Sequence, residues 1–270
     1  MTQSGDPDES GMTVLLSTGA ERRLERDLHV AALVHRSMIP ANQRRGNIEV
    51  VCDFRPSIGI GGDYASVHFK DEQHVVVGIC DVSGHGVAAA LLASRVNSFV
   101  LNQASLVHHP GQLVEALNDF VFRTFHHTGL YLTFFTLFID LDKQTVCGAG
   151  CGHPPVLHVV KHGESVCRLD SGNLPIGLFE DLSPTFSMLR IPFLPGDRLV
   201  LYTDGITESL GPDGSELGVD GLERYVAASA DRSLEEFAEA IRQRVEQFRG
   251  GVRPDDDELL LAIAYLEAEG

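Results

Sequence analysis

The first patterned segment of the chain is a helix. Between Glu21 and Ile39, apolar or weakly polar residues recur every three or four positions, namely Leu24, Leu28, Ala31, His35 and Met38. This spacing predicts a helix that buries one face, and Pro40 ends it because proline cannot extend the helical hydrogen-bond ladder. Residues 1–20 are rich in Ser, Gly, Asp and Thr and are expected to form a flexible tail.

The rest of the chain, residues 41–270, is expected to form one domain. Strand patterns come in runs, at 48–54, 64–69, 75–80, 131–140, 145–150, 156–160, 166–169, 185–191, 198–203 and 259–266. Helical patterns are grouped between them, at 87–107, 111–125 and 233–248. Asp142-Lys143 supplies a hairpin turn, and Ser233 with Glu236 forms a capping box. Runs of strands with grouped helices predict an α+β protein rather than alternating βαβ units.

Composition and charge narrow the classes of function. The chain has 38 acidic and 21 basic residues and a formal net charge of −17, which disfavours nucleic acid binding because phosphate contacts need clustered Lys and Arg. Its apolar runs fall well short of the ~20 residues that span a bilayer, so no membrane partner is expected. The acidic N-terminus does not resemble a secretory signal, and five cysteines, an odd number, favour reduced thiols. We therefore expect a cytoplasmic protein.

Acidic residues stand where strand patterns meet turns, in most cases beside glycine. Asp63 follows Gly61-Gly62, Asp81 lies between a strand and Ser83-Gly84-His85-Gly86, and Asp204 precedes Gly205. Asp255-Asp256-Asp257 stands immediately before the final strand pattern. Any one of these residues could simply cap a helix or shape a turn.

Four carboxylate positions at strand ends are better explained by divalent cations. Mg²⁺ and Mn²⁺ prefer oxygen ligands, glycine permits close backbone approach, and clustered carboxylates repel one another unless a cation neutralises them. The Walker A, GxSxG, HExxH and GxGxxG motifs are missing from the sequence. The chemistry that remains is attack by a metal-activated water on an ester, most naturally a phosphoester.

Several motifs, in order along the chain, resemble the SpoIIE/RsbU-like branch of the metal-dependent protein phosphatase (PPM, type 2C) family. The resemblance runs from about Val30 to Leu266 and is carried by residues 58–64 (IGIGGDY), 81–91 (DVSGHGVAAAL), 151–155 (CGHPP), 175–177 (PIG), 195–197 (PGD) and 202–208 (YTDGITE). Each motif alone is weak, but all of them in family order make a specific match.

The resemblance implies a β-sandwich of two mainly antiparallel sheets flanked by helices, with two Mn²⁺ or Mg²⁺ ions at one end. It implies that Asp63 bridges the ions and that Asp81, the Val82 carbonyl and Asp204 are further ligands. Aligning the family's Asp-Asp-x-Thr nominates Asp256, with Asp255 or Asp257 as alternatives one residue away. A water bridging the ions would then attack phosphoserine or phosphothreonine without a phosphoenzyme.

Histidines add candidates for proton transfer. His85 and His153 lie in glycine-flanked loops, and His85 could protonate the leaving seryl oxygen. The alternative is that each histidine hydrogen-bonds backbone at a tight turn. Two doublets, His108-His109 and His126-His127, are expected to act as solvated caps at helix ends.

The family branch also implies partners. The substrate would be a phosphorylated regulator, such as an anti-sigma-factor antagonist in a partner-switching circuit. The helix at 21–40 would pack on the phosphatase core or on a second copy of the chain, although a purely structural helix is an equal alternative. Ser66 stands where the family often has a second acid, so a non-catalytic binding module with the same fold is the second hypothesis for function.

Overall fold

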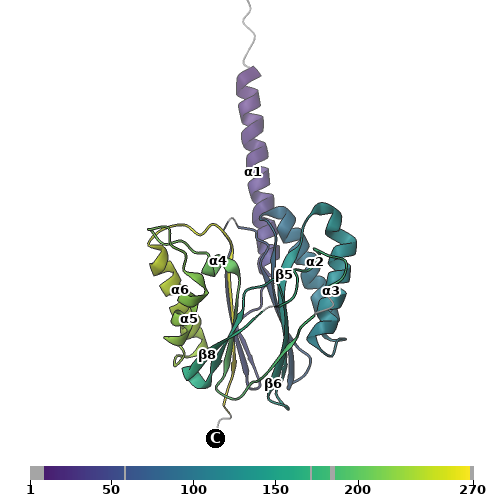
Figure 1. The fold of residues 1–270 in the computed structure, drawn as a ribbon. Helices are drawn as coiled ribbons and strands as arrows, with labels where there is room; N and C mark the ends of the chain where they lie inside the picture. Colours follow the sequence, from purple (N-terminus) through teal and green to yellow (C-terminus); the bar gives the residue numbers. More distant parts are fainter. Residues whose placement is uncertain (1–8, 58, 171, 183–185, 268–270) are drawn as a thin grey trace, which may run out of the picture.

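The computed structural model describes residues 9–270 apart from 58, 171, 183–185 and 268–270, with the side chains of 9–18 also left aside. Within these residues the strands form two antiparallel sheets that pack face to face (Figure 1). The first sheet has the order β1 (Gln43–Arg45), β2 (Ile48–Arg55), β11 (Glu258–Tyr265), β10 (Arg198–Tyr202), β7 (Val156–Val160) and β8 (Ser165–Leu169). The second has the order β3 (Tyr64–Phe69), β4 (His74–Val82), β5 (Leu132–Asp140), β6 (Thr145–Cys151) and β9 (Leu189–Pro192).

Helices cover the outer face of each sheet, so the molecule has four layers (Figure 1). Helices α2 (Val87–Ala104) and α3 (Pro110–Phe125) pack on the second sheet, and α5 (Gly218–Ala227) and α6 (Leu234–Arg249) pack on the first. Short helical segments are α4 (Asp204–Thr207), η1 (His126–Thr128) and η2 (Lys161–Gly163). The expected sandwich of two mainly antiparallel sheets flanked by helices is therefore confirmed.

The core between the sheets follows from alternation along the strands. Val77 and Leu137 of the second sheet and Leu199 and Leu261 of the first are completely buried in one cluster. Burying each such side chain contributes roughly 1.5–3 kcal/mol, so this layer fixes the sheets against each other. Fixing the sheets also fixes the loops at their ends, where the predicted carboxylates lie.

The N-terminal helix differs from the expectation in two ways. Helix α1 spans Glu9–Arg36, so residues 9–20 are helical rather than a flexible tail; residues 1–8 lie outside the described residues. No proline interrupts this stretch, and extending an existing helix costs little compared with starting one. The expected buried stripe was also wrong, because α1 projects beyond both sheets (Figure 1) and leaves Leu24 60% and Leu28 37% exposed. His35 alone of the stripe is fully buried, at 3% exposure.

Most predicted strands and helices lie within a few residues of their expected bounds. Residues 186–188 of the expected 185–191 strand are not strand, and residue 185 lies outside the described part of the chain. Helix α5 was missed, because its ten residues carry an apolar stripe too short to stand out. Among the described residues, no helix has the length and apolarity needed to cross a bilayer.

Candidate metal centre

Asp63 is held at the start of β3 by a loop that only glycine allows. A Cβ on Gly62 would lie 2.9 Å from the Val82 carbonyl oxygen, so this loop packs directly against the end of β4. The Asp63 side chain is 3% exposed, and its Oδ2 accepts a hydrogen bond of 2.6 Å from the Thr203 hydroxyl. The same packing brings the Val82 carbonyl, a predicted ligand, close to the Asp63 loop.

Asp81 and Val82 are the last two residues of β4. The chain then turns sharply into α2 through Gly84 and Gly86, whose φ values of +88° and +78° are strained for any residue with a side chain. Asp81 is half-buried and lies beside Asp63, Asp204 and Asp256, each of which affects its pKa. The strand end therefore presents a carboxylate and a carbonyl at one point.

Asp204 begins α4, and Thr203 alone separates it from the end of β10. A Cβ on the next residue, Gly205, would lie 2.0 Å from the Asp257 carbonyl oxygen, so the β10–α4 turn rests on the chain that enters β11. Glycine at this position is what allows Asp204 to approach the Asp255–Asp257 segment. The backbone contact between Gly205 and Asp257 thus brings together two segments that are about fifty residues apart in sequence.

The three aspartates before β11 have different surroundings. Asp257 is 4% exposed, and its Oδ1 accepts a 2.8 Å hydrogen bond from the Ser57 backbone N–H. Asp256 is exposed, and its Oδ1 accepts from the Asp257 N–H at 2.8 Å. Of the two, Asp256 is the stronger electrostatic neighbour of Asp81, and it also lies beside Asp204. These contacts leave Asp256 available to a cation and give Asp257 a role in holding the loop.

The carboxylates raise one another's pKa. Burial first and the Asp81 carboxylate second hold the pKa of Asp63 well above its usual range. Burial, followed by Asp204 and Asp256, raises the pKa of Asp81 to about 7. Burial and then Asp256 also raise the pKa of Asp204. Like charges held together and partly removed from water disfavour the ionised form, and a cation among them reverses this effect.

The donor set fits hard divalent cations. Asp63, Asp81, Asp204 and Asp256, together with the Val82 carbonyl, offer only oxygen atoms, as Mg²⁺ and Mn²⁺ prefer. Their carboxylate oxygens are more spread out than in a single-ion cage, since among the described residues only His74, Asp140 and Asp142 have ligand atoms all within 4.8 Å of one another.

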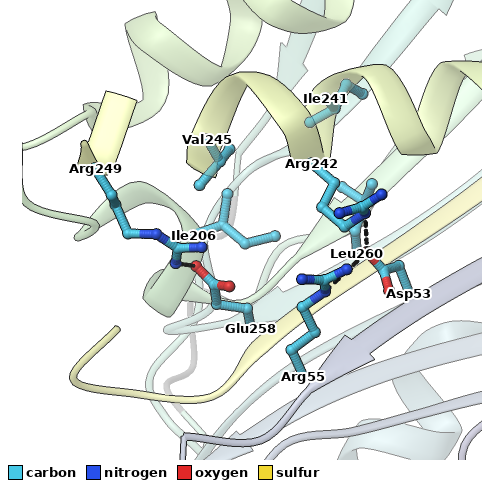
Figure 2. Close-up of a pocket in the computed structure, with 9 residues that line it drawn as sticks. All are labelled: Asp53, Arg55, Ile206, Ile241, Arg242, Val245, Arg249, Glu258 and Leu260. Carbon is cyan, nitrogen blue, oxygen red and sulfur yellow. Dashed lines mark hydrogen bonds and ion pairs between the residues drawn. The ribbon is translucent and has the colours of Figure 1, made fainter. Parts of the chain in front are cut away.

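An ion-pair layer under α6 fixes the start of β11. Figure 2 shows Arg249 of α6 pointing at Glu258, with which it forms a buried salt bridge. Arg55 and Arg242 both approach Asp53, at 3.6 and 3.7 Å. The small cavity between them, about 20 Å³, is too small for a ligand. This layer therefore positions the residue that follows Asp257 and does not form a second site.

The remaining predicted residues are placed as follows. His85 is exposed in the turn after β4, and within the described part of the chain its ring makes no hydrogen bond. His153 is 3% exposed, its Nδ1 lies 2.8 Å from the Thr133 hydroxyl oxygen, and burial lowers its pKa to about 3. A neutral, buried His153 agrees with the structural alternative. Ser66 is 5% exposed on β3, opposite Gly78.

Thr203 is the residue that sequence reasoning missed. Its hydroxyl donates to Asp63 and accepts a 3.0 Å hydrogen bond from the Leu259 N–H. It links β3, β10 and β11 at the point where the carboxylates meet. The sequence signal for it was its position in the motif at residues 202–208, between Tyr202 and the predicted ligand Asp204.

The two helix-flanked antiparallel sheets, with carboxylates gathered at loops between them, define a PP2C-type phosphatase fold. A sequence model described as "Stage II sporulation protein E (SpoIIE)" matches residues 71–265. That range is well over half of the chain, so the chain belongs to the SpoIIE family. The expected family is confirmed.

Two curated relatives are phosphoserine phosphatases of Bacillus subtilis (strain 168). RsbP is 24% identical over 242 residues, which are 88% of this chain and 58% of RsbP. RsbU is 24% identical over 198 residues, which are 73% of this chain and 58% of RsbU. The chain thus spans a little over half the length of each of these relatives.

Solved structures share the fold. The SiaA-PP2C domain of Pseudomonas aeruginosa has a TM-score of 0.80 at 20% identity, over 91% of this chain and 98% of that one. RsbX in complex with magnesium has a TM-score of 0.63 at 13% identity, over 82% of this chain and 97% of that one. At these identities the likeness establishes the architecture.

Proposed function

We propose that this protein is a metal-dependent phosphatase that hydrolyses phosphoserine or phosphothreonine on a regulatory protein. The observation that carries the proposal is the meeting of Asp63, Asp81, Asp204 and Asp256 at one end of the sandwich, where burial and the neighbouring carboxylates raise the pKa of the first three. The names of RsbP and RsbU, both phosphoserine phosphatases, support the same activity.

Asp63, Asp81, Asp204, Asp256 and the Val82 carbonyl would hold two Mn²⁺ or Mg²⁺ ions. Bound there, the ions would supply an activated water and neutralise charge on the phosphoryl group. The magnesium in RsbX, which has this fold, supports the choice of a hard cation. Asp255 and Asp257 are the alternatives to Asp256, and the hydrogen bond from Ser57 to Asp257 favours Asp256.

The chain's own residues orient these ligands. Thr203 fixes the Asp63 carboxylate through a 2.6 Å hydrogen bond, and Gly62 and Gly205 let the loops that carry the ligands close upon one another. Such outer partners hold a ligand in one rotamer and keep its charge directed at the ion. Preorganisation of this kind reduces the cost of reorienting groups during reaction.

His85 is proposed as the general acid that protonates the leaving seryl oxygen. Its exposed ring stands in the turn that follows Asp81, and it has no competing hydrogen bond within the described chain. Histidine is the side chain most often used as a general acid or base in catalysis. If His85 has only a structural role, replacing it will leave the pH dependence of kcat unchanged.

The substrate class and the assembly are also proposals. Following the family branch, the phosphoprotein would be an anti-sigma-factor antagonist in a cytoplasmic partner-switching circuit. A second copy of the chain would cover the apolar face of α1, since Leu24 and Leu28 are exposed where the helix projects from the sheets (Figure 1). A paired helix would bury this face in the manner of a coiled coil.

The activity is tested by phosphate release from a phosphoserine-containing anti-sigma-factor antagonist. We expect release with added Mn²⁺ and a loss of at least about 100-fold in Asp81→Asn or Asp204→Asn, because removing a ligand disrupts the ions that activate water. Lys161→Gln, an exposed change far from the centre, serves as the control. Undiminished turnover in excess EDTA would overturn the proposal, and Mn²⁺ binding without turnover of any phosphoprotein would favour the binding module.

A further inference from the structure

A second cavity, of about 480 Å³, lies at the other end of the sheet that carries Asp81. Its floor is the outer face of that sheet. One row across the strands is His74, Asp140 and Thr145, which are direct neighbours in the register of β4, β5 and β6. The next row is Val76, Phe138, Cys147 and Arg190, which ends on β9.

The wall of the cavity is the connection between α2 and α3. Ser105, His108, His109 and Pro110 line it, and Pro110 is the first residue of α3. His109 is the N-cap of this helix, but its side chain makes no capping hydrogen bond. The sequence-based expectation of a capping role for this doublet was therefore wrong. Cations are unfavourable at a helix N-terminus, whereas an anion there is stabilised by the helix dipole.

The cavity has more basic than acidic side chains, although the protein as a whole has a net charge of −17. Lys70, Lys143 and Arg190 line it together with three histidines, against the two carboxylates of Asp71 and Asp140. Both carboxylates already have hydrogen-bonding partners. Asp71 lies 2.9 Å from His74 Nδ1, and Asp140 accepts a 2.6 Å hydrogen bond from Lys143 Nζ.

The other basic side chains of the cavity lack acidic partners. Lys70 Nζ donates to the Val107 carbonyl at 2.7 Å, and Arg190 Nε donates to Cys147 Sγ at 3.2 Å. In the part of the chain that the structure describes, no carboxylate pairs with Lys70, Arg190, His108 or His109. Neutral or weak acceptors leave these groups with donors to spare for an anion.

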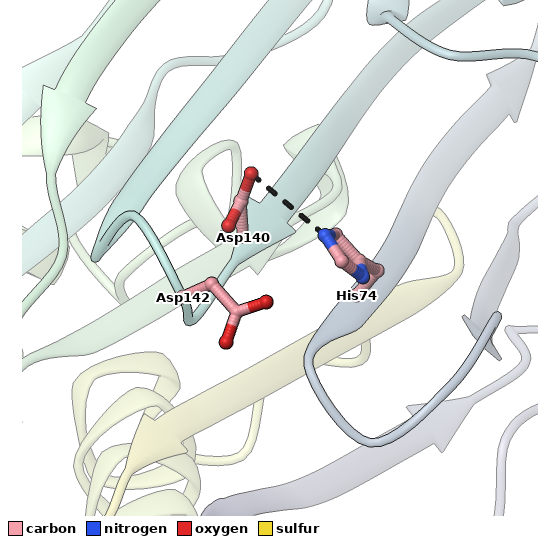
Figure 3. Close-up of side chains that lie close together, drawn as sticks. All are labelled: His74, Asp140 and Asp142. Carbon is pink, nitrogen blue, oxygen red and sulfur yellow. Dashed lines mark ion pairs between the residues drawn. The ribbon is translucent and has the colours of Figure 1, made fainter.

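The same contacts argue against a metal ion at this end of the sheet. Figure 3 shows His74, Asp140 and Asp142, whose ligand atoms lie within 4.8 Å of one another. The ammonium group of Lys143 donates a hydrogen bond to Asp140 Oδ2, and His74 Nε2 lies 3.8 Å from the same oxygen. A cation would have to displace Lys143 from Asp140, and the third ligand, Asp142, is exposed.

We propose that this cavity binds a phosphorylated small molecule. The phosphate would lie among Arg190, Lys70 and the start of α3, because guanidinium and ammonium groups form charge-assisted hydrogen bonds with phosphate oxygens. The organic part would lie on Val76, Phe138 and Pro110, the apolar portion of the lining. The volume falls within the roughly 300–1,000 Å³ of small-molecule sites and is concave, which favours a small ligand over a protein segment.

The site is separate from the proposed catalytic centre. His74 and Asp81 are seven residues apart on β4, or about 23 Å at ~3.3 Å per residue. A phosphate at this end cannot contact the carboxylates at the other, so it is neither the reacting group nor the released product. The proposal stands whether or not the protein is a phosphatase.

Isothermal titration calorimetry on the Mg²⁺-loaded full chain tests the proposal, with pyrophosphate, adenosine monophosphate and adenosine as probes. We expect the two phosphates to bind and adenosine to bind at least about tenfold more weakly. The double variant Lys70→Gln/Arg190→Gln, which removes both proposed phosphate contacts, should lose at least about tenfold in affinity for the phosphates. Arg123→Gln/Lys161→Gln, with the same change of charge on exposed residues elsewhere, should not.

Asp204→Asn separates this site from the catalytic centre. Phosphate binding that survives Asp204→Asn but not the double variant supports the proposal, even if the protein proves to be no phosphatase. Binding lost in Asp204→Asn and kept in the double variant places the phosphate at the metal centre and overturns it. Absence of binding by either phosphate up to about 5 mM also overturns it, provided that thermal unfolding shows each variant to be folded.

Discussion

Thr203 and Asp63 are 140 residues apart in sequence, and the Thr203 hydroxyl donates a 2.6 Å hydrogen bond to Asp63 Oδ2. The same hydroxyl oxygen accepts from the Leu259 N–H at 3.0 Å. One small side chain thus joins β10, β11 and the proposed bridging ligand, and all three groups are buried. Because the Thr203 hydrogen is committed to Asp63, the carboxylate is held in a single orientation.

Thr203→Val is expected to weaken Mn²⁺ binding about tenfold or more, because partners of metal ligands are worth about 10- to 100-fold in affinity. It should also lower the free energy of unfolding by about 1–3 kcal/mol, since the Leu259 N–H loses its acceptor in a buried position. Calorimetry and denaturant unfolding measure the two effects. Thr203→Ser keeps the hydroxyl and is the control; equal loss in both variants would contradict a role for the hydrogen bond.

Replacing Asp256 should affect metal binding, whereas replacing Asp257 should affect the stability of the protein. Asp256→Asn removes a proposed ligand from an exposed position, so we expect a large loss of Mn²⁺ affinity with little change in the stability of the metal-free protein. Asp257→Asn weakens the hydrogen bond from Ser57 and should lower stability by about 1 kcal/mol while metal stoichiometry is kept. Binding titrations paired with unfolding curves distinguish them, and the reverse pattern would assign the ligand to Asp257.

His153 should make the protein sensitive to acid. Burial lowers the pKa of His153 to about 3, from an ordinary value of ~6.5. Between these two values the unfolded chain binds a proton at this residue and the folded protein does not. Stability is then lost as the pH falls, by about 2 kcal/mol between about pH 6 and about pH 4.

His153→Gln should remove this part of the pH dependence, giving a shallower fall in unfolding free energy than the unsubstituted protein. Substitution of His127, which is exposed, is the matched control. Parallel curves for His153→Gln and the original chain would show that the buried ring does not titrate with unfolding.

The exposed face of α1 should control the oligomeric state. Leu24→Glu/Leu28→Glu places charges on the face proposed to pair with a second copy, and we expect a dimer to become a monomer in sedimentation. Arg22→Glu/Arg26→Glu alters charge elsewhere on the same helix as the control. A monomer before substitution, or a dimer after it, would contradict pairing through α1.

Most of the fold could be predicted from the sequence because strand alternation and turn residues are local signals. The β5–β6 hairpin around Asp142-Lys143 and the capping box of Ser233 and Glu236 lie where their residues predicted. The stripe of α1 was misjudged for a different reason. Periodicity identifies an apolar face, but only the course of the chain decides whether another element covers it.

The candidate site was partly accessible in the same way. Asp63, Asp81 and Asp204 could be nominated because each stands where a strand pattern meets a glycine-rich turn. The roles of Asp256 and Asp257 could not be separated, because their difference depends on Ser57, about 200 residues away. Thr203 lies within a motif that the sequence showed, but its hydrogen bonds to Asp63 and Leu259, like the cavity beside Arg190, depend on contacts between segments that are distant in the chain.

Anomalous scattering from crystals soaked in Mn²⁺ would show whether these distant carboxylates share a pair of divalent ions. We expect two peaks at the end of the sandwich, bounded by Asp63, Asp81, the Val82 carbonyl, Asp204 and Asp256. No peak among these residues at saturating Mn²⁺, or manganese bound only beside His74 and Asp140, would contradict it.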